Sequence, residues 1–263
     1  MEQQKSSLTT ELVSKVAGVS KLNNYEELYD GSTRIVDLHS SMYLIPINET
    51  RREFILIDSG INTYAKKLRS YLGQTGLCLN AIKEVYTTHA HADHVGGLSE
   101  IYDQTDAEIF ISKEELPVLS GQKISQGPVP YVIDVLTCRR LASVPEVKPT
   151  LISEGDFSNK IGKLSIKAIS VPGHTDGSLS YLVSSDGGRT GALYVGDALD
   201  FDKSGSVKPA ALMFSKNHQE SKNSINHLVY YIEENLGTKI RQVIPSHSGQ
   251  GRFGSVRNYA FNS

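Results

Sequence analysis

The pattern of apolar residues predicts a strand-rich first half of the chain. Short apolar runs typical of strands occur at residues 34–38, 41–47, 54–57 and 82–88. The run at 54–57 is Phe-Ile-Leu-Ile, as expected for a strand that is covered on both faces. Between the last two runs, helical spacing predicts one helix that ends near Gly73 or Gly76, with these residues on one face: Tyr64, Leu68, Tyr71 and Leu72.

Helices and strands are also expected to alternate after residue 88. The pattern predicts a helix at 97–102, a strand at 107–111 and a short helix at 113–119. Residues 120–149 differ, because glycines and prolines are scattered through them without a sustained period. Loops of this length in a compact domain are usually functional or mobile. We therefore interpret 120–149 as a candidate flap over a site, with a plain surface insertion as the alternative.

The second half of the chain shows the same kind of pattern as the first half, but the two halves do not share a repeated sequence. It predicts strands at 163–171, 178–183, 191–195 and 240–244. One clear amphipathic helix precedes the last strand and is capped by Gly237; its apolar face carries Ile225, Leu228, Val229, Ile232 and Leu236. This mixture of strands and helices places the chain in the α/β class.

Length and composition limit the kind of protein further. A chain of 263 residues can bury one sizeable core, as a single α/β domain or as two closely packed halves. Its net charge of −2 and its lack of long basic runs argue against a nucleic-acid partner. No apolar run approaches the length of a membrane span, and no hydrophobic signal region opens the chain, so we expect a cytoplasmic protein without a membrane partner.

The first 30 residues look like an appendage to a domain at 31–263. Apolar residues recur near helical spacing at Leu8, Leu12, Val16 and Val19, and polar residues then break the pattern. Such a segment could pack on the domain or on a second subunit, so a homodimer is compatible with the sequence.

A cluster of metal-binding side chains follows the strand at 82–88. Residues 88–97 read THAHADHVGG, so three imidazoles and a carboxylate fall within six residues. In an extended chain His89 and His91 project to the same side and can share one ion. Asp93 and His94 lie where the chain turns away, so they could begin a second metal sphere. Imidazole and carboxylate without thiolate favour Zn²⁺, Fe or Mn²⁺ in a catalytic site.

Three more candidate ligands follow later strands. His174 ends the strand at 163–171, Asp197 ends the strand at 191–195, and His247 ends the strand at 240–244. These positions, with the cluster, resemble the metallo-β-lactamase superfamily, whose hydrolases carry H-x-H-x-D-H, then a His after Gly, then Gly-Asp, then a late His. The resemblance covers roughly residues 33–250, with every motif in order, and implies an αββα sandwich of two mixed sheets flanked by helices.

The resemblance also implies a role for each of these residues. It assigns a first metal to His89, His91 and His174, and a second to Asp93, His94 and His247. Asp197 would bridge both metals, which we expect to be two Zn²⁺ per chain, with Fe or Mn as alternatives. Asp58, in the early Asp-x-Gly turn, would support the ligand loops by hydrogen bonding rather than bind metal; the alternative is a simple turn former.

The expected function is that of a dinuclear metal-dependent hydrolase. Two adjacent metals lower the pKa of a shared water, and the resulting hydroxide would attack the carbonyl of a small substrate such as a lactone, ester, thioester or amide. Asp93 would be catalytic, because it could orient the nucleophile or pass a proton to the departing atom.

Departures from family patterns narrow the substrates without naming one. Asp197 stands where the thiolate subclass of zinc β-lactamases carries Cys, which disfavours penicillin-type activity. Only sixteen residues follow His247, whereas glyoxalase II enzymes add a helical glutathione-binding region there. Quorum-quenching lactonases place a Tyr three residues after the bridging Asp, and this chain has Asp200. His91 argues against the iron and flavin branch, which has Glu at that position.

Two other classes of function stay open. Persulfide dioxygenases resemble this family and use a single iron, held by residues equivalent to His89, His174 and Asp197. A metal-binding module without catalysis is the second, although seven retained ligands count against it. The remaining histidines match no motif, and we interpret them as surface or satisfied core residues: His39, His218 and His227.

Overall fold

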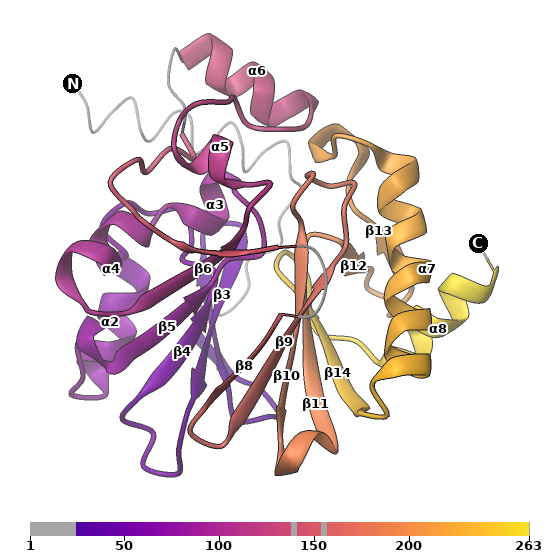
Figure 1. Ribbon diagram of the computed structural model, residues 1–263, viewed down its shortest axis with the longest axis horizontal. Coiled ribbons are helices and arrows are strands. Elements are labelled where there is room, and N and C mark those ends of the chain that lie inside the picture. Colours follow the sequence, from indigo (N-terminus) through magenta and orange to yellow (C-terminus); the bar gives the residue numbers. More distant parts are fainter. Residues whose placement is uncertain (1–24, 138–140, 154–156, 263) are drawn as a thin grey trace.

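The computed structural model describes residues 25–137, 141–153 and 157–262 of the chain. Two β-sheets pack face to face, and helices cover the outer face of each sheet (Figure 1). Each sheet contains parallel and antiparallel neighbours, so both are mixed. The predicted αββα sandwich of two mixed sheets is therefore confirmed. The amphipathic pattern at Leu8–Val19 lies outside the described residues.

The first sheet has seven strands in sequence order, antiparallel up to β4 and parallel from β4 to β7. Its strands are β1 Tyr25–Glu27, β2 Thr33–Asp37, β3 Ser40–Pro46, β4 Phe54–Ile57, β5 Ile82–Tyr86, β6 Glu108–Ser112 and β7 Thr150–Ile152. The strands expected at 34–38, 41–47, 54–57, 82–88 and 107–111 are all present.

The second sheet has five strands in the order β14-β11-β10-β9-β8, with β11 and β14 parallel and the other neighbours antiparallel. Its strands are β8 Ser158–Ile161, β9 Leu164–Ser170, β10 Leu179–Ser185, β11 Thr190–Gly196 and β14 Lys239–Pro245. A small separate hairpin is formed by β12 Leu199–Phe201 and β13 Val207–Pro209. The pattern did not predict β1, β7, β8 or this hairpin, because each of these strands has only three or four residues.

Helices from different parts of the chain cover the two sheets (Figure 1). The first sheet is covered by α2 Lys66–Gln74, α3 Ala92–Val95, α4 Leu98–Gln104 and α5 Leu116–Leu119, and the second by α7 His218–Asn235 and α8 Phe253–Asn262. The other helical segments are α6 Pro128–Thr137 and the single turns η1 Leu79–Ala81, η2 Asp186–Gly188 and η3 Leu212–Phe214. Among the described residues, none of the helices combines the length and apolar character that crossing a bilayer requires.

Strand β4 shows why a continuous apolar run specifies this layered arrangement. Leu56 packs against the helices, whereas Ile55 and Ile57 face the second sheet. Because side chains alternate across a strand, both faces of β4 are buried and a polar residue would be costly at any of its positions. Burial of each such aliphatic side chain stabilises the fold by about 1.5–3 kcal/mol.

Four fully buried tyrosines lie in the interior, and two of their hydroxyls reach strand ends. Tyr181 donates to the carbonyl of Thr87 (2.8 Å), just after β5, and Tyr43 donates to the carbonyl of Pro245 (2.5 Å), at the end of β14. Tyr86 and Tyr194 donate to the carboxylates of Glu84 and Asp30. Burial raises the pKa of Tyr181 well above its usual range, so its hydroxyl stays protonated and donates.

Strand direction places the candidate site residues at one edge of the two sheets. Strands β4, β5 and β6 are parallel to one another, and β9, β11 and β14 also share one direction. The residues singled out in the sequence follow the carboxyl ends of these strands, and carboxyl ends of parallel strands gather at one edge of a sheet.

Residues 128–137 contain a helix where we had expected a stretch without sustained period. The two prolines of α6 stand in its first turn, where a missing N–H costs little. The helix has no polar face in the sequence, because Asp134 and Thr137 are its only polar residues, so no amphipathic period marks it. Its apolar residues Tyr131, Val132 and Leu136 are exposed, and its one buried residue is Asp134.

Asp134 gives a direct test of what holds this segment. Its carboxylate accepts from the backbone N–H groups of Ser125 and Leu141, both at 3.0 Å. An Asp134→Ala variant loses both acceptors, and each unsatisfied N–H costs about 1–3 kcal/mol. We expect limited proteolysis, mapped by mass spectrometry, to cut within 120–149 at least about tenfold faster, because cleavage follows the population of the opened form.

The matched control is Val132→Ala, which changes an exposed residue of the same helix. Equal cleavage of the two variants would show that Asp134 does not hold this segment.

Candidate metal centre

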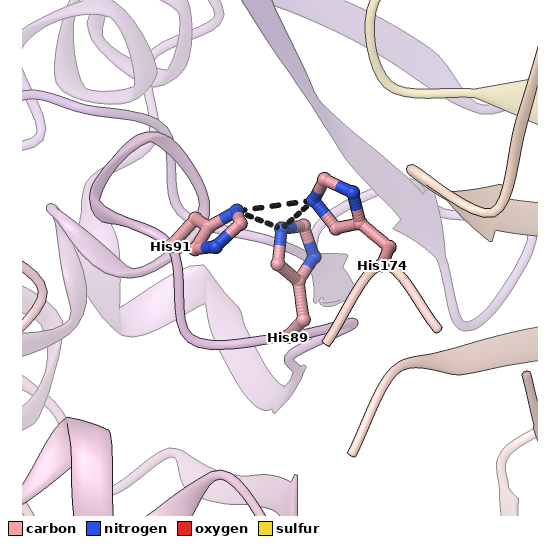
Figure 2. A group of neighbouring side chains, drawn as sticks. All are labelled: His89, His91 and His174. Carbon is pink, nitrogen blue, oxygen red and sulfur yellow. Dashed lines mark hydrogen bonds between the residues drawn. The ribbon is translucent and has the colours of Figure 1, made fainter. Parts of the chain in front are cut away.

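His89, His91 and His174 meet at the edge where the two sheets come together. His89 and His91 lie in the loop between β5 and α3, and His174 lies in the loop between β9 and β10. Figure 2 shows the three rings pointing at one another. The Nε2 atom of His174 lies 3.2 Å from Nε2 of His89 and 3.0 Å from Nδ1 of His91, and these last two atoms are 3.1 Å apart.

This triangle matches the ligand spacing of a tetrahedral metal site. With Zn–N bonds of 2.0–2.1 Å, neighbouring nitrogens of a tetrahedral zinc site lie about 3.3 Å apart. All three residues are buried, so their lone pairs face no bulk water. The residues therefore fit a zinc ion in both donor type and spacing.

A second group of donors lies beside the first. Asp93 and His94 are on the short helix α3, and His247 follows β14. Oδ2 of Asp93 is 3.5 Å from Nε2 of His94 and 3.5 Å from Nε2 of His247. These three atoms lie within 4.8 Å of one another, as donors to one cation must.

The carboxylate of Asp197 lies between the two groups. Its Oδ2 atom is 3.4 Å from Nε2 of His174 and 2.9 Å from Nε2 of His247. Its Oδ1 atom is 3.4 Å from Nε2 of His94. The structure thus brings all seven sequence-predicted ligands together, with Asp197 in contact with both groups.

Each imidazole is held by its outer nitrogen, which leaves the other nitrogen free to face the centre. The outer N–H donates to a protein oxygen at 2.8–3.4 Å in every case: His89 to Thr88 Oγ1, His91 to the Gln126 carbonyl, His94 to Asp58, His174 to Ser215 Oγ and His247 to the His39 carbonyl. Such contacts fix the tautomer and orientation of a metal-binding histidine.

Two buried polar atoms provide a further test of the fit. Nε2 of His94 and Oδ1 of Asp197 have no hydrogen-bond partner among the described residues. A buried polar atom without a partner is costly, and native proteins rarely leave one unexplained. A cation between these two atoms would satisfy both.

The centre contains both neutral and charged side chains. Burial lowers the pKa of His89 well below its usual range and that of His174 to about 3, so both rings are neutral. Burial opposes ionisation of Asp93 and protonation of His247. Nevertheless, His94 holds the pKa of Asp93 well below its usual range, and Asp197 raises the pKa of His247 to about 10. A divalent cation would compete with the proton on His247, so binding would release protons.

Asp58 contacts the ligand loop and not the centre itself. Its Oδ1 atom accepts from the backbone N–H of Thr88 (2.8 Å), and its Oδ2 atom accepts from Nδ1 of His94 (2.8 Å). Asp58 has a φ of 57°, an uncommon backbone conformation for a residue other than glycine. The strained turn is held in place because the carboxylate is buried and fully bonded.

Glu115 is a buried carboxylate that our reading of the sequence did not single out. It lies just after β6, and its two oxygens accept from the N–H of Ala90 (2.7 Å) and the N–H of Gly177 (2.8 Å). Ala90 separates His89 from His91, and Gly177 stands three residues after His174. Glu115 therefore connects the loops that carry the first ligand group, across a sequence separation that no local pattern reveals.

His39 is the second residue that the sequence did not reveal. We interpreted it as a surface or satisfied core histidine, but it lies against two of the predicted ligands. Its Nε2 atom is 3.2 Å from Oδ2 of Asp93, and its ring stacks on that of His247 with centroids 5.7 Å apart. Because it matches no motif and precedes β3, far from the cluster in sequence, nothing local marks it.

Comparison with known proteins places these motifs in a family. A sequence model described as the metallo-beta-lactamase superfamily matches residues 35–231. The chain is 30% identical over 118 residues to the probable metallo-hydrolase YqgX of Bacillus subtilis, covering 44% of this chain and 50% of that one. It is 29% identical over 158 residues to a hydroxyacylglutathione hydrolase of Crocosphaera subtropica, covering 56% and 49%. The chain thus spans about half the length of these curated relatives.

A solved structure shares the fold. It is described as the first B3 metallo-beta-lactamase with an active-site glutamic acid. It superimposes with a TM-score of 0.62 at 18% identity and covers 95% of this chain and 90% of that one. At this level of identity the likeness concerns the fold alone.

Removal of the Glu115 carboxylate tests its connection of the two loops. In Glu115→Ala the N–H groups of Ala90 and Gly177 lose their acceptor, so the first ligand group becomes less ordered. We expect Zn²⁺ affinity, measured by competition with a chromophoric chelator, to fall about 10–100-fold. Glu114→Ala is the control, because among the described residues Glu114 bonds only to Ser112 and Lys113. Unchanged affinity in Glu115→Ala would contradict this role.

Proposed function

The chain belongs to the metallo-beta-lactamase superfamily, and from that membership we propose that it is a metal-dependent hydrolase that binds two divalent cations. The substrate would be a small molecule with a reactive carbonyl, as in a lactone, ester, thioester or amide. One observation carries the proposal: five imidazoles point one nitrogen each at a common centre while the protein occupies the other. A protein that kept only the fold would have no need of this arrangement of ring nitrogens.

We assign the donors to two cations. His89, His91 and His174 would hold the first, and Asp93, His94 and His247 the second. Asp197 would be shared, since its two oxygens face different groups. Zinc is the expected metal because imidazole and carboxylate donors suit it, and Fe or Mn²⁺ could bind the same set.

Two cations held there would supply Lewis acidity, which lowers the pKa of water and polarises a carbonyl oxygen. The side chains would provide orientation and charge. Asp93 stays ionised and is held by His39, so its carboxylate can accept a hydrogen bond from the attacking water. We assign to Asp93 the role of orienting that water, and of passing its proton to the departing atom. Asp58 would keep His94 in position rather than bind a cation.

We further propose that residues 120–149 form a flap over this centre within one domain of residues 31–263. The carbonyl of Gln126 accepts from Nε2 of His91 (2.8 Å), and its side chain accepts from the N–H of Asp176 (2.9 Å). A Cβ atom on Gly127 would lie 2.2 Å from the carbonyl oxygen of Phe214, so this glycine allows the segment to approach η3 closely. The segment is therefore attached on both sides of the centre.

The names of two relatives indicate which class of substrate to test first. Relatives named hydroxyacylglutathione hydrolase make a thioester a reasonable first choice. The residue three positions after Asp197 is Asp200, whose pKa burial raises to about 6, and it offers no phenol to polarise a lactone carbonyl. We therefore rank thioesters before lactones.

A single-iron enzyme would need only His89, His174 and Asp197. Because persulfide dioxygenases keep the other histidines as well, the completeness of the group of Asp93, His94 and His247 does not decide between the two functions. Metal content separates the two functions directly.

We expect protein purified without added metal to contain about two zinc ions per chain by inductively coupled plasma mass spectrometry. A panel of thioesters, lactones and β-lactams should then give turnover that a chelator abolishes and zinc restores, since the cations supply the Lewis acidity. About one iron per chain without hydrolysis would reject this function and favour persulfide oxidation.

Asp93→Asn tests the catalytic role. Asparagine keeps the shape but loses the negative charge that orients the water, so we expect kcat to fall by about 10²–10⁴-fold, as when a general acid or base is removed. Assays at saturating zinc separate this effect from weaker metal binding. Asp103→Asn, an exposed aspartate on α4, is the control. Full turnover with full metal content in Asp93→Asn would remove the assignment.

A further inference from the structure

Away from the metal centre, a cavity lies at the opposite end of β14 from His247. It is an open groove of about 500 Å³ between the end of α7, the start of β14 and the start of α8. Figure 1 shows these three elements together on the side of the second sheet that carries α7. Lys239 begins β14 and Pro245 ends it, so the groove and the metal centre are separated by roughly 20 Å at 3.3 Å per residue.

The groove is strongly cationic in a chain whose net charge is −2. Four cations line it, Lys239, Arg241, Arg252 and Arg257, against the single acid Glu233. Glu233 is already paired with Arg257, with Oε1 and Nε 3.2 Å apart. Three cationic side chains therefore share the groove without an acid of their own.

The unpaired cations have free donors. Arg241 lies over the ring of Tyr29 with its guanidinium 5.9 Å from the ring centroid, which leaves its N–H edges open. Within the described part of the chain, the side chains of Lys239 and Arg252 make no hydrogen bond or ion pair, and both are exposed. Like charges gathered around one cavity repel one another, and a bound anion would relieve that repulsion.

The residues that line the groove indicate which kind of anion it would bind. Guanidinium groups present a planar fork of N–H donors that matches two oxygens of a phosphate. Ile232, Ile240 and Phe253 form an apolar part of the wall beside these cations. A volume of about 500 Å³ lies within the usual range of small-molecule sites.

We propose that this groove is an anion site for a phosphate-bearing small molecule. The cations Lys239, Arg241 and Arg252 would bind the phosphate oxygens, and Phe253 would contact the remainder of the molecule. None of these residues belongs to the metal centre, so the site does not depend on the hydrolase function.

Inorganic phosphate is the probe, because it tests the shared chemistry of such ligands. We would titrate it into ¹⁵N-labelled, metal-loaded protein at constant ionic strength and follow backbone amide shifts. The expected shifts concentrate at residues 237–241 and 252–257. In Arg241→Gln/Arg252→Gln the affinity should fall at least tenfold, since two of the three unpaired cations are gone.

Lys160→Gln/Lys203→Gln removes the same charge from exposed positions outside the groove and should bind phosphate as the parent does. Shifts confined to residues 88–94 and 172–176 would mean that phosphate binds only at the metal centre, and would overturn the proposal. An equal loss of affinity in the control pair would also overturn it, because binding would then follow overall charge. The spectrum of each variant reports its folding, and the shift map of the parent protein tests the site without any substitution.

Discussion

The centre depends on a different surrounding for each of the two nitrogens of an imidazole ring. One nitrogen bonds to the protein, and the other faces a centre shared with two half-buried carboxylates. Crowding so many donors into one place is unfavourable in itself, because like-charged or lone-pair-bearing groups repel at short range. The outer hydrogen bonds keep the rings from turning away, since each ring that rotated would leave a buried N–H without an acceptor. The oxygens that accept these bonds are thus as much part of the centre as the ligands.

The candidate ligands and the groups that hold them come from both sheets, and strand direction explains how they meet. Asp58 follows β4, Glu115 follows β6, and the carbonyl of His39 precedes β3, all in the first sheet. His247 follows β14 in the second sheet and donates across to that carbonyl (2.8 Å). Because the ligand-bearing strands share one direction within each sheet, their carboxyl ends form one edge, and short loops suffice to bring the donors together.

Sequence could predict the parts of this centre that are local and periodic. The run at 54–57 was predicted as a strand covered on both faces, and β4 is such a strand. The spacing of His89 and His91 led us to expect their side chains on one side of the chain, and their rings do lie in contact. The later candidate ligands His174, Asp197 and His247 were identified because each ends a predicted strand and fits a family motif. His39 and Glu115 were missed, since each acts through a partner more than twenty residues away. Helix α6 was missed because nearly all of its residues are apolar, so no helical period is visible, and because two prolines stand in its first turn.

The buried tyrosines connect the core to the centre. Tyr181 and Tyr43 bond to the carbonyls of Thr87 and Pro245, each two residues before a candidate ligand. Packing between the sheets therefore sets where His89 and His247 begin, and a core substitution at either tyrosine would be felt at the metal centre. On the other side of the centre, the carbonyl of Gln126 bonds to His91, and Ser215, just after η3, bonds to His174. Such loops can change without loss of the ligands, which is the physical reason why one fold and one metal centre serve many substrates.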